Sequence, residues 1–387
     1  MKITAIKSFV VNARLRNWIF VRVETDVPGL YGLGEATLEF QTRAVAGAID
    51  DLALLIRGND PLNIEHLWQV MFRHPFFKGG IVTMSALSGI DQALHDIKAK
   101  HLGIPLWQLL GGLCRTRLRM YDHLGGGNSD AVYNSAVADD FRDRAAQSRA
   151  DGFTAVKILA VGRTAPLDGL GALKEAEELM AAAREGGGED MDIMVDLHGR
   201  TTAAMAIQYA KVLEPYRPFF IEEPCQPEDW KGTARVARST PVPIAAGERL
   251  VHRHEFLHLL QSEAIAVAQP DVCHAGGLTE VRRIAALCDT FGVSMAPHNP
   301  LGPIATMVNI HLGFATPNFL IQEVMRSDVP WRDEVISGVS PIVGGYVEPS
   351  QAPGIGVEIN FDAAKKYTFA EVQPIQWYQH DGSVADW

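Results

Sequence analysis

Three acidic residues recur at a constant spacing in the middle of the 387-residue chain. Asp196, Glu222 and Glu248 each close a short apolar run, in "IMVDLHGR", "FFIEEP" and "IAAGERL", and successive members are 26 residues apart. At about 4 Å and an effective dielectric constant near 20, two carboxylates repel by about 4 kcal/mol. Three gathered together therefore need a cation between them. Oxygen ligands without a nearby cysteine favour Mg²⁺ before Mn²⁺ or Ca²⁺, so the pattern predicts that these acids bind Mg²⁺.

Three further polar residues continue the series. Asp271, His298 and Glu323 close the next three apolar runs, in "AVAQPDVCHAGG", "MAPHNPLGP" and "FLIQE", at steps of 23, 27 and 25 residues. A carboxylate on one imidazole nitrogen fixes the tautomer and makes the other nitrogen a better base, so Asp271 is predicted to orient His298 as a base. His198 lies two residues past Asp196. Two histidines on opposite sides of a cation suit removing a proton from one carbon and protonating a group that leaves the next.

A plainer interpretation exists for each of these residues. An acid at the end of a strand commonly caps the following helix or forms a salt bridge, and a histidine is more often a satisfied structural group. Neither role requires a regular period, so the shared spacing favours a site. His274 does not share this spacing, and we expect it to be structural or to face the substrate.

The elements that must position these residues are strands and helices in alternation. From about residue 116, helix-like stretches separate most of eight short apolar runs: "RLRMYDHL", "FTAVKILA", "DIMVDL", "PFFIEE", "VPIAA", "AIAVAQ", "VSMAP" and "FLIQE". Such alternation predicts a parallel sheet. Eight strands favour closure into a barrel, where the carboxyl ends of all strands meet at the face that carries active sites. The strands end in acids because their ends form the floor of a site.

The rest of the chain is predicted to surround this barrel. No helical stripe follows Glu323, so we expect seven βα units and a last strand over residues 116–340. Residues 1–115 contain three strand-like runs and then amphipathic helices, which predicts an α+β capping domain. Residues 341–387 are rich in turn residues and are predicted to pack back on that domain. The expected fold is α/β, a (β/α)7β modified TIM barrel whose N-terminal α+β capping domain is completed by the C-terminal segment.

Composition excludes several classes of protein. The net charge of −11 argues against nucleic-acid binding. The four cysteines of the chain lie far apart without a C-x-x-C pair, so neither a zinc site nor a disulfide framework is indicated. The chain has neither a signal-peptide apolar block nor a run of about 18 apolar residues. We therefore expect a cytoplasmic protein without membrane contact. The triple glycine at 125–127 lacks the lysine and spacing of a phosphate loop, so it is interpreted as a strand-to-helix turn.

The strand-end motifs resemble those of a known family. "VDLHGR", "FIEEP", "AAGERL", "QPDVCHAGG" and "APHNPLGP" are similar to motifs of the enolase superfamily, in its mandelate racemase-like branch, and within it to galactonate dehydratase-type acid-sugar dehydratases. "ALSGIDQALHDIKAKHLGIPLWQLLGG" and "PGIGVEIN" resemble the capping-domain signatures, so the likeness spans the chain. Enolase-superfamily sites use a lysine or histidine base with Mg²⁺ that stabilises an ene-diolate.

The resemblance implies a role for each site residue. It implies that Asp196, Glu222 and Glu248 bind Mg²⁺. It also implies that His298 is the base, oriented by the carboxylate of Asp271, and that His198 is the acid that protonates the leaving hydroxyl. Glu323 matches the position that hydrogen-bonds the enolate, which requires a protonated or well-partnered carboxyl. Lys157 and Arg249 are expected to contact the substrate, although a lysine at a strand end is more often a solvated or salt-bridged group. The branch commonly forms dimers or octamers, which implies a homo-oligomer.

One departure from the family pattern bears on the reaction. Lysine-based members carry Lys-x-Lys at the end of the second barrel strand, whereas this chain has Lys157 followed by Leu159 in "VKIL". A racemase that handles the proton on both faces needs a basic residue there. Its absence favours dehydration over racemisation.

The resulting hypothesis is β-elimination of water from a small-molecule sugar acid, with D-galactonate as the first candidate and gluconate or arabinonate next. His298 takes the C2 proton, and His198 protonates the departing 3-hydroxyl, which leaves a 2-keto-3-deoxy acid. Three alternatives are an acid-sugar racemase or epimerase on the same scaffold, a glycoside hydrolase with paired carboxylates, and a non-catalytic sugar-acid binder. Substrate selectivity is expected from three N-terminal loops, "RLRNW", "ATLEFQTR" and "HPFFKGG".

Overall fold

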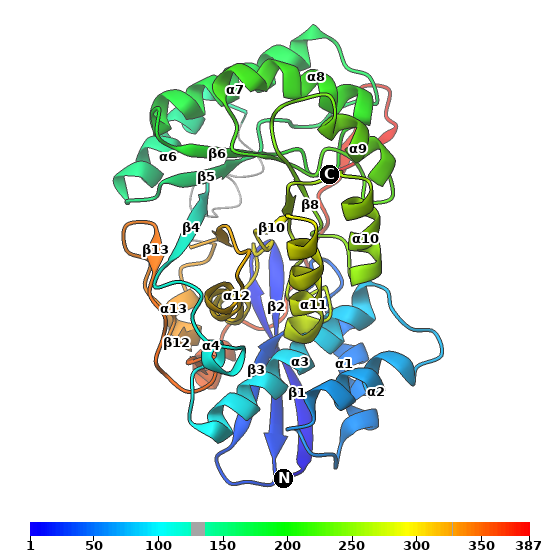
Figure 1. Ribbon diagram of the computed structural model, residues 1–387, viewed down its shortest axis with the longest axis vertical. Coiled ribbons are helices and arrows are strands. Elements are labelled where there is room, and N and C mark those ends of the chain that lie inside the picture. Colours follow the sequence, from blue (N-terminus) through cyan, green and yellow to red (C-terminus); the bar gives the residue numbers. More distant parts are fainter. Residues whose placement is uncertain (125–135, 327) are drawn as a thin grey trace.

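Eight short parallel strands, one in each of the predicted apolar runs, form the main sheet. They are β4 (Leu118–His123), β5 (Ala155–Ile158), β6 (Asp192–Asp196), β7 (Ile221–Glu222), β8 (Ile244–Ala246), β9 (Val267–Ala268), β10 (Ser294–Met295) and β11 (Gln322–Val324). The computed structural model describes residues 1–124, 136–326 and 328–387 (Figure 1). The triple glycine at 125–127 therefore lies outside the described residues.

The sheet closes on itself. Its strand order is β10-β9-β8-β7-β6-β5-β4-β11. The amide and carbonyl of Met295 in β10 hydrogen-bond Asn318 and Leu320, in the run that leads into β11. These bonds join the two ends of the sheet, so the strands form the predicted barrel.

A helix follows each of the first seven barrel strands. These helices are α6 (Ala138–Ala150), α7 (Leu170–Gly187), α8 (Ala203–Leu213), α9 (Trp230–Ala237), α10 (Arg253–Gln261), α11 (Gly277–Thr290) and α12 (Pro303–Ala315). In the part of the chain that the structure describes, only the four-residue helices α13 (Arg332–Val335) and α14 (Phe361–Ala364) follow β11. The (β/α)7β architecture predicted from the sequence is confirmed.

One apolar side chain from each strand or its flank fills the barrel interior. The eight form a buried cluster of their own: Tyr121, Ala155, Met194, Phe220, Ala245, Val267, Ala296 and Ile321. Alternate residues of a strand point to the same face, so a residue two positions further on also points inward, one layer closer to the carboxyl ends. The barrel is therefore packed below and polar above, because that next layer contains Lys157, Asp196, Glu222, His298 and Glu323.

The capping domain is an antiparallel sheet covered by helices. Its elements are β1 (Ile3–Ala13), β2 (Arg16–Thr25), β3 (Tyr31–Glu35), α1 (Thr42–Ile56), α2 (Ile64–Arg73), α3 (Ile81–Leu102) and α4 (Leu106–Leu109). The central helix α3 ends at Gly103, whose φ of 67° is left-handed. Gly32 and Gly34 lie against α3, where a Cβ would overlap helix carbonyl oxygens. Glycine there lets the helix approach the sheet closely.

Buried polar groups join the capping domain to the barrel. Asp91 on α3 accepts hydrogen bonds from the backbone and hydroxyl of Thr279, at 3.0 and 2.6 Å, in the first turn of α11. Glu35 at the end of β3 accepts from the amides of Gly302 and Ala305, at 2.7 and 2.9 Å, where α12 begins. Each carboxylate supplies acceptors to the free amides of a helix N-terminus, so the two domains are bonded at two barrel helices.

The C-terminal segment contacts both domains. Its strand β13 (Tyr346–Val347) pairs antiparallel with β4 of the barrel, and β14 (Glu358–Ile359) pairs with β12 (Ile336–Ser337). The carbonyl of Tyr367 then accepts from the amide of Asn12 in β1. The chain continues through the hairpin of β15 (Trp377–Tyr378) and β16 (Val384–Ala385) and ends close to the barrel strands (Figure 1).

Among the described residues, none of the helices is long and apolar enough to cross a membrane. The four cysteines are free; Cys114 is exposed and the other three are buried.

Candidate active site

Two predicted metal ligands lie side by side at the carboxyl ends of β6 and β7. Asp196 and Glu222 are register partners in the parallel ladder, so their backbones are about 4.8 Å apart. Both are buried, as is Glu248, which follows the end of β8. The neighbouring Glu223 has a positive φ of 46°, and its carboxylate pairs with Arg249 instead of entering the barrel. The structure therefore places the side chain of Glu222, and not that of Glu223, in the polar layer inside the barrel.

Lys157 is the buried counter-charge of these acids. Its side chain is 2% exposed, and its Nζ lies 2.8 Å from Glu222 Oε1, 2.7 Å from Glu323 Oε1 and 3.9 Å from Asp196 Oδ2. Burial would lower the pKa of Lys157, but Glu222 and Glu323 outweigh it and hold the pKa well above its usual value. Burial, together with repulsion from Asp196, raises the pKa of Glu222 well above its usual value, and Lys157 opposes this only in part.

Glu323 is a well-partnered carboxylate. It accepts from Lys157, from His123 Nε2 at 2.5 Å and from the Asn299 backbone amide at 2.6 Å. Burial alone would raise the pKa of Glu323, but Lys157 and His123 outweigh it and hold the pKa well below its usual value. The sequence analysis expected Glu323 to be either protonated or well partnered, and the structure favours the well-partnered carboxylate.

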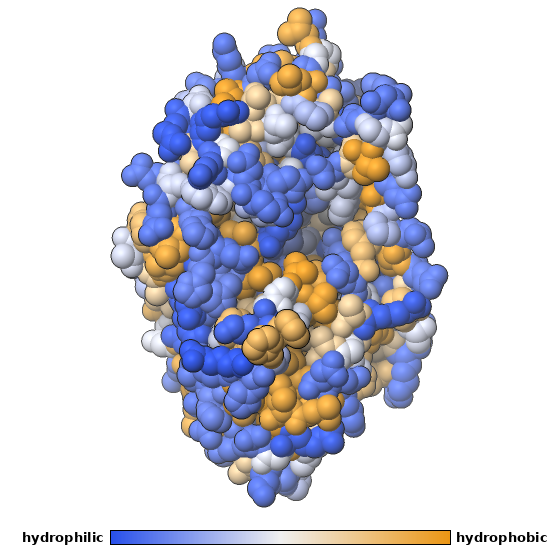
Figure 2. Space-filling model, turned by 90° about the vertical axis from the view of Figure 1, so that its right-hand side faces the viewer, coloured by the Kyte–Doolittle hydropathy of each residue, from blue (hydrophilic) through white to orange (hydrophobic). Residues whose placement is uncertain are grey.

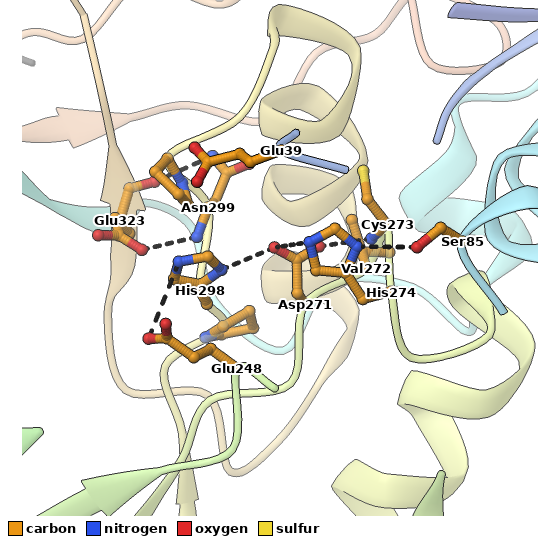
Figure 3. A network of polar contacts seen from close by, with 12 residues as sticks. Glu39, Ser85, Glu248, Asp271, Val272, Cys273, His274, His298, Asn299 and Glu323 are labelled. Carbon is orange, nitrogen blue, oxygen red and sulfur yellow. Dashed lines mark hydrogen bonds and ion pairs between the residues drawn. The ribbon is translucent and has the colours of Figure 1, made fainter. Parts of the chain in front are cut away.

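The predicted base and its orienting acid are in contact. His298 Nδ1 lies 2.7 Å from Asp271 Oδ2, and its Nε2 lies 3.8 Å from Glu248 Oε2 (Figure 3). Burial disfavours the imidazolium, but Glu248 and the hydrogen bond to Asp271 outweigh it and raise the pKa of His298 to about 10. Burial also opposes ionisation of Glu248, yet the adjacent His298 and His198 lower the pKa of Glu248 to about 2. These two pKa values favour an imidazolium at His298 that is paired with the carboxylate of Glu248.

His198 is held at a turn in the left-handed conformation. Its φ is 53°, and its backbone amide donates to Asp196 Oδ1 at 2.6 Å, which holds this turn against Asp196. Burial lowers the pKa of His198. Its ring meets the ring of Trp387 edge to face, with centroids 5.1 Å apart. An aromatic residue from the C-terminal segment thus covers the predicted acid.

Arg249 makes protein contacts at all three guanidinium nitrogens. Its Nε donates to Glu223 at 2.7 Å, one terminal nitrogen pairs with the same carboxylate, and the other donates to Gln226 at 2.8 Å. Lys157 is likewise bonded to protein acids. The substrate contacts of Lys157 and Arg249 stay a prediction.

The acid set fits a hard cation in kind, although the side chains do not form a closed metal site. Within the described residues, no three His, Cys, Asp or Glu side chains are grouped so as to hold a metal ion as they stand. Glu222 Oε2 and Glu248 Oε2 are buried without a hydrogen-bond partner in the described part of the chain. Such orphaned carboxylate oxygens are costly unless a ligand satisfies them. The chain therefore supplies the oxygen donors that Mg²⁺ prefers.

Two of the three predicted selectivity loops reach the barrel. Arg16 pairs with Glu39 at 3.0 Å and also donates to the carbonyl of Pro300, two residues past His298. Phe40, from the same loop as Glu39, contacts the Trp387 ring at 5.6 Å.

The third loop, between α2 and α3, carries Phe76 and Phe77, which are 88% and 91% exposed. This loop stands out on the face shown in Figure 2, where hydrophobic residues gather midway down the molecule.

A cavity of about 860 Å³ between α2, α3 and α11 contains none of the predicted site residues in its lining.

Sequence reasoning missed two residues of the site. His123, which is bonded to Glu323, stands two positions past the interior residue Tyr121, so the strand period of two could have found it. Trp387 carries no such signal, because its position depends on the path of the C-terminal segment.

Fold and site together define the class of this protein. A (β/α)7β barrel with acids and an Asp–His pair at its strand ends, beneath an α+β capping domain, is the architecture of the enolase superfamily. The chain belongs to that superfamily. Residues 140–364 match the family described as Enolase C-terminal domain-like, and residues 6–111 match the Mandelate racemase / muconate lactonizing enzyme, N-terminal domain.

Individual relatives are similar over the whole chain. D-galactonate dehydratases from Cronobacter sakazakii and Xanthomonas campestris are each 39% identical over 100% of both chains. An enolase from Agrobacterium radiobacter, solved with bound Na and L-malate, is 31% identical with a TM-score of 0.89 over 100% of both chains. A mandelate racemase/muconate lactonizing enzyme from Jannaschia sp. CCS1 is 32% identical with a TM-score of 0.89, over 96% of this chain and 98% of the other.

Proposed function

We propose that this protein is a carbon–oxygen lyase that dehydrates a sugar acid to a 2-keto-3-deoxy acid. The observation that carries the proposal is the pair of imidazoles on either side of the buried acids. His298 is bonded to Asp271 and faces Glu248, whereas His198 is fixed beside Asp196. One histidine can take a proton from C2 while the other gives a proton to the 3-hydroxyl.

The residues suit these roles by their surroundings. Asp271 holds the His298 ring so that Nε2 faces the substrate side, where it would remove the C2 proton. The lowered pKa of His198 makes its protonated form a stronger acid, which a departing hydroxyl requires. The Lys157 ammonium would donate to the oxygens on which negative charge develops, and the partnered Glu323 carboxylate would hold that ammonium in place.

A divalent cation, Mg²⁺ first, completes the proposed site. Asp196, Glu222 and Glu248 would hold it, and their two orphaned buried oxygens support this assignment. When bound, the ion would stabilise the charge of the ene-diolate and offset the negative charge of Glu248, which now raises the pKa of His298.

The proposed substrate is an aldonate, D-galactonate first and gluconate or arabinonate next. Two D-galactonate dehydratases are 39% identical over the full length, and a relative that is 31% identical was solved with L-malate, itself a 2-hydroxy acid. A homo-oligomer, either a dimer or an octamer, is part of the proposal, and light scattering after size-exclusion chromatography measures it.

The test is a stereochemically complete panel of aldonates incubated with the protein and Mg²⁺, with 2-keto acids quantified by semicarbazone absorbance. We expect one aldonate to give product, and we expect His298→Asn and His198→Asn to lose at least 1,000-fold in kcat/KM, roughly the contribution of a positioned acid or base. His254→Asn, a histidine on α10 outside the acid cluster, is the matched control. No 2-keto product from any aldonate would refute the proposal.

Solvent deuterium separates the dehydratase from the epimerase alternative. An epimerase returns substrate that is deuterated at C2 in both configurations and eliminates no water. Leu159 stands where a racemase of this branch would need its second lysine, so we expect elimination without epimerised substrate.

A further inference from the structure

A second histidine contacts the carboxylate that orients the base. Asp271 Oδ2 lies 2.7 Å from His298 Nδ1 and 3.6 Å from His274 Nε2, on opposite sides (Figure 3). Its other oxygen accepts from the Cys273 amide at 2.6 Å. The Asp271 carboxylate is therefore oriented by three groups, and only one of them is the base.

His274 is fixed from the capping domain. It is 6% exposed, and its Nδ1 lies 3.1 Å from the hydroxyl of Ser85 on α3, which is fully buried. A neutral imidazole carries its proton on one nitrogen only. If the Ser85 hydroxyl donates to Nδ1, Nε2 bears the proton and presents it to Asp271, whereas the opposite tautomer would point a lone pair at the carboxylate. Electrostatics therefore selects the tautomer in which His274 supports the acid.

The loop that carries Asp271 and His274 is anchored to the same helix at further points. Gln92, two turns along α3 from Ser85, donates to the carbonyl of Val272 at 3.0 Å, and Asp91 binds Thr279 just beyond the loop. Gly277, between these anchors, has a φ of 70°, and a Cβ there would lie 2.5 Å from Asp91 Oδ2. The position of the loop relative to α3 is thus tightly constrained.

We propose that His274, held by Ser85, is a positioning residue that fixes the Asp271 carboxylate against the base His298, so that helix α3 of the capping domain contributes to orienting the base. This inference rests on the proposed role of His298. A purely structural histidine would support folding without affecting proton abstraction, so the test must separate these two effects.

The discriminating variants are His274→Gln and His274→Leu. A glutamine amide nitrogen reaches about as far as the histidine Nε2 and can donate to Asp271, whereas leucine fills similar space without a donor. With substrate and Mg²⁺ in excess, we expect His274→Leu to lose at least tenfold in kcat with KM within twofold, and His274→Gln to stay within threefold of the wild-type kcat. Ser85→Ala should lie between them. His311→Leu, which removes a buried histidine outside this network, is the matched control for stability.

The isotope effect identifies the step that is affected. Substrate deuterated at C2 should show a larger primary isotope effect on kcat in His274→Leu than in the wild type, because misplacing the base slows C–H cleavage specifically. A crystal structure of His274→Leu should show the Asp271 carboxylate turned from His298.

The inference is overturned if His274→Leu keeps the wild-type kcat and isotope effect, or if the Gln and Leu variants are equally impaired. His298→Asn, measured in parallel, distinguishes the two levels of failure. Full activity in His298→Asn would refute the proposed function, whereas an inactive His298→Asn with unaffected His274 variants would refute only the role of His274.

Discussion

Replacing Lys157 by methionine tests the charge balance of the site directly. Methionine keeps the length and apolar body of the side chain but removes the ammonium that lies 2.8 Å from Glu222 and 2.7 Å from Glu323. The two carboxylates would then be left in a buried position without their cation. We expect the metal-free variant to be less stable than the metal-free wild type.

The size of the effect follows from the burial of the pair. Removing one partner of a buried ion pair costs about 3–5 kcal/mol, because the other charge stays desolvated. An unfolding entropy of about 2.1 cal/mol/K per residue gives roughly 0.8 kcal/mol per degree for this 387-residue chain. The melting temperature of Lys157→Met should therefore fall by about 4–6 °C. Lys365→Met, which breaks an exposed pair with Asp362, is the control and should leave the melting temperature nearly unchanged.

Thermal scans with EDTA and with Mg²⁺ complete the experiment. If the acids bind Mg²⁺, the ion should raise the melting temperature of Lys157→Met by more than it raises that of the wild type, because the ammonium no longer offsets the negative charge that attracts the ion. A metal-free variant as stable as the wild type would show that Lys157 does not neutralise these acids. Equal stabilisation of both proteins by Mg²⁺ would place the cation elsewhere.

Three further predictions concern stability and the site entrance. Burial lowers the pKa of His311 to about 4. The contribution of the neutral His311 to the free energy of unfolding is therefore fully present above pH 6.5 and declines as the pH falls towards 4, by at most about 3 kcal/mol. Urea denaturation at stepped pH should show a smaller decline in His311→Gln. Trp387→Ala removes the ring against His198 and should lower kcat/KM about 2–10-fold in steady-state assays with little change in melting temperature. Gly302→Ala puts a Cβ into the Glu35 carboxylate and should cost about 1–3 kcal/mol in calorimetry, whereas an unchanged melting temperature would mean that this junction can relax.

The positions of the site residues were predictable because strand geometry is local. A parallel barrel repeats one strand and one helix at a nearly constant length, so polar residues that recur at that period must meet at one end. Asp196, Glu222, Glu248 and His298 follow this rule. The same rule extended by the strand period of two would also have found His123, two residues past the interior residue Tyr121.

The partners of those residues were not predictable, because they depend on contacts between segments distant in sequence. Lys157 was expected to contact the substrate, but its ammonium is bonded to Glu222 and Glu323. His274 does not share the regular spacing of the strand-end residues, and the residue it contacts, Ser85, is 189 residues away in the sequence. Periodicity specifies the face on which a side chain lies, whereas its partner is set by how the two domains dock.

The charges of the buried groups at the strand ends are not balanced. Five carboxylates gather there: Asp196, Glu222, Glu248, Asp271 and Glu323. Against them stand the Lys157 ammonium and the His298 imidazolium, whose pKa of about 10 is itself a response to the surplus of negative charge. Among the described residues, these two cations face five carboxyl groups, and burial together with repulsion from Asp196 raises the pKa of Glu222, which disfavours its ionised form. A divalent cation would remove most of the surplus and release the proton that His298 must lose before it can act as a base. Binding of the cation and activation of the base are therefore expected to be linked, because both depend on the charge of Glu248.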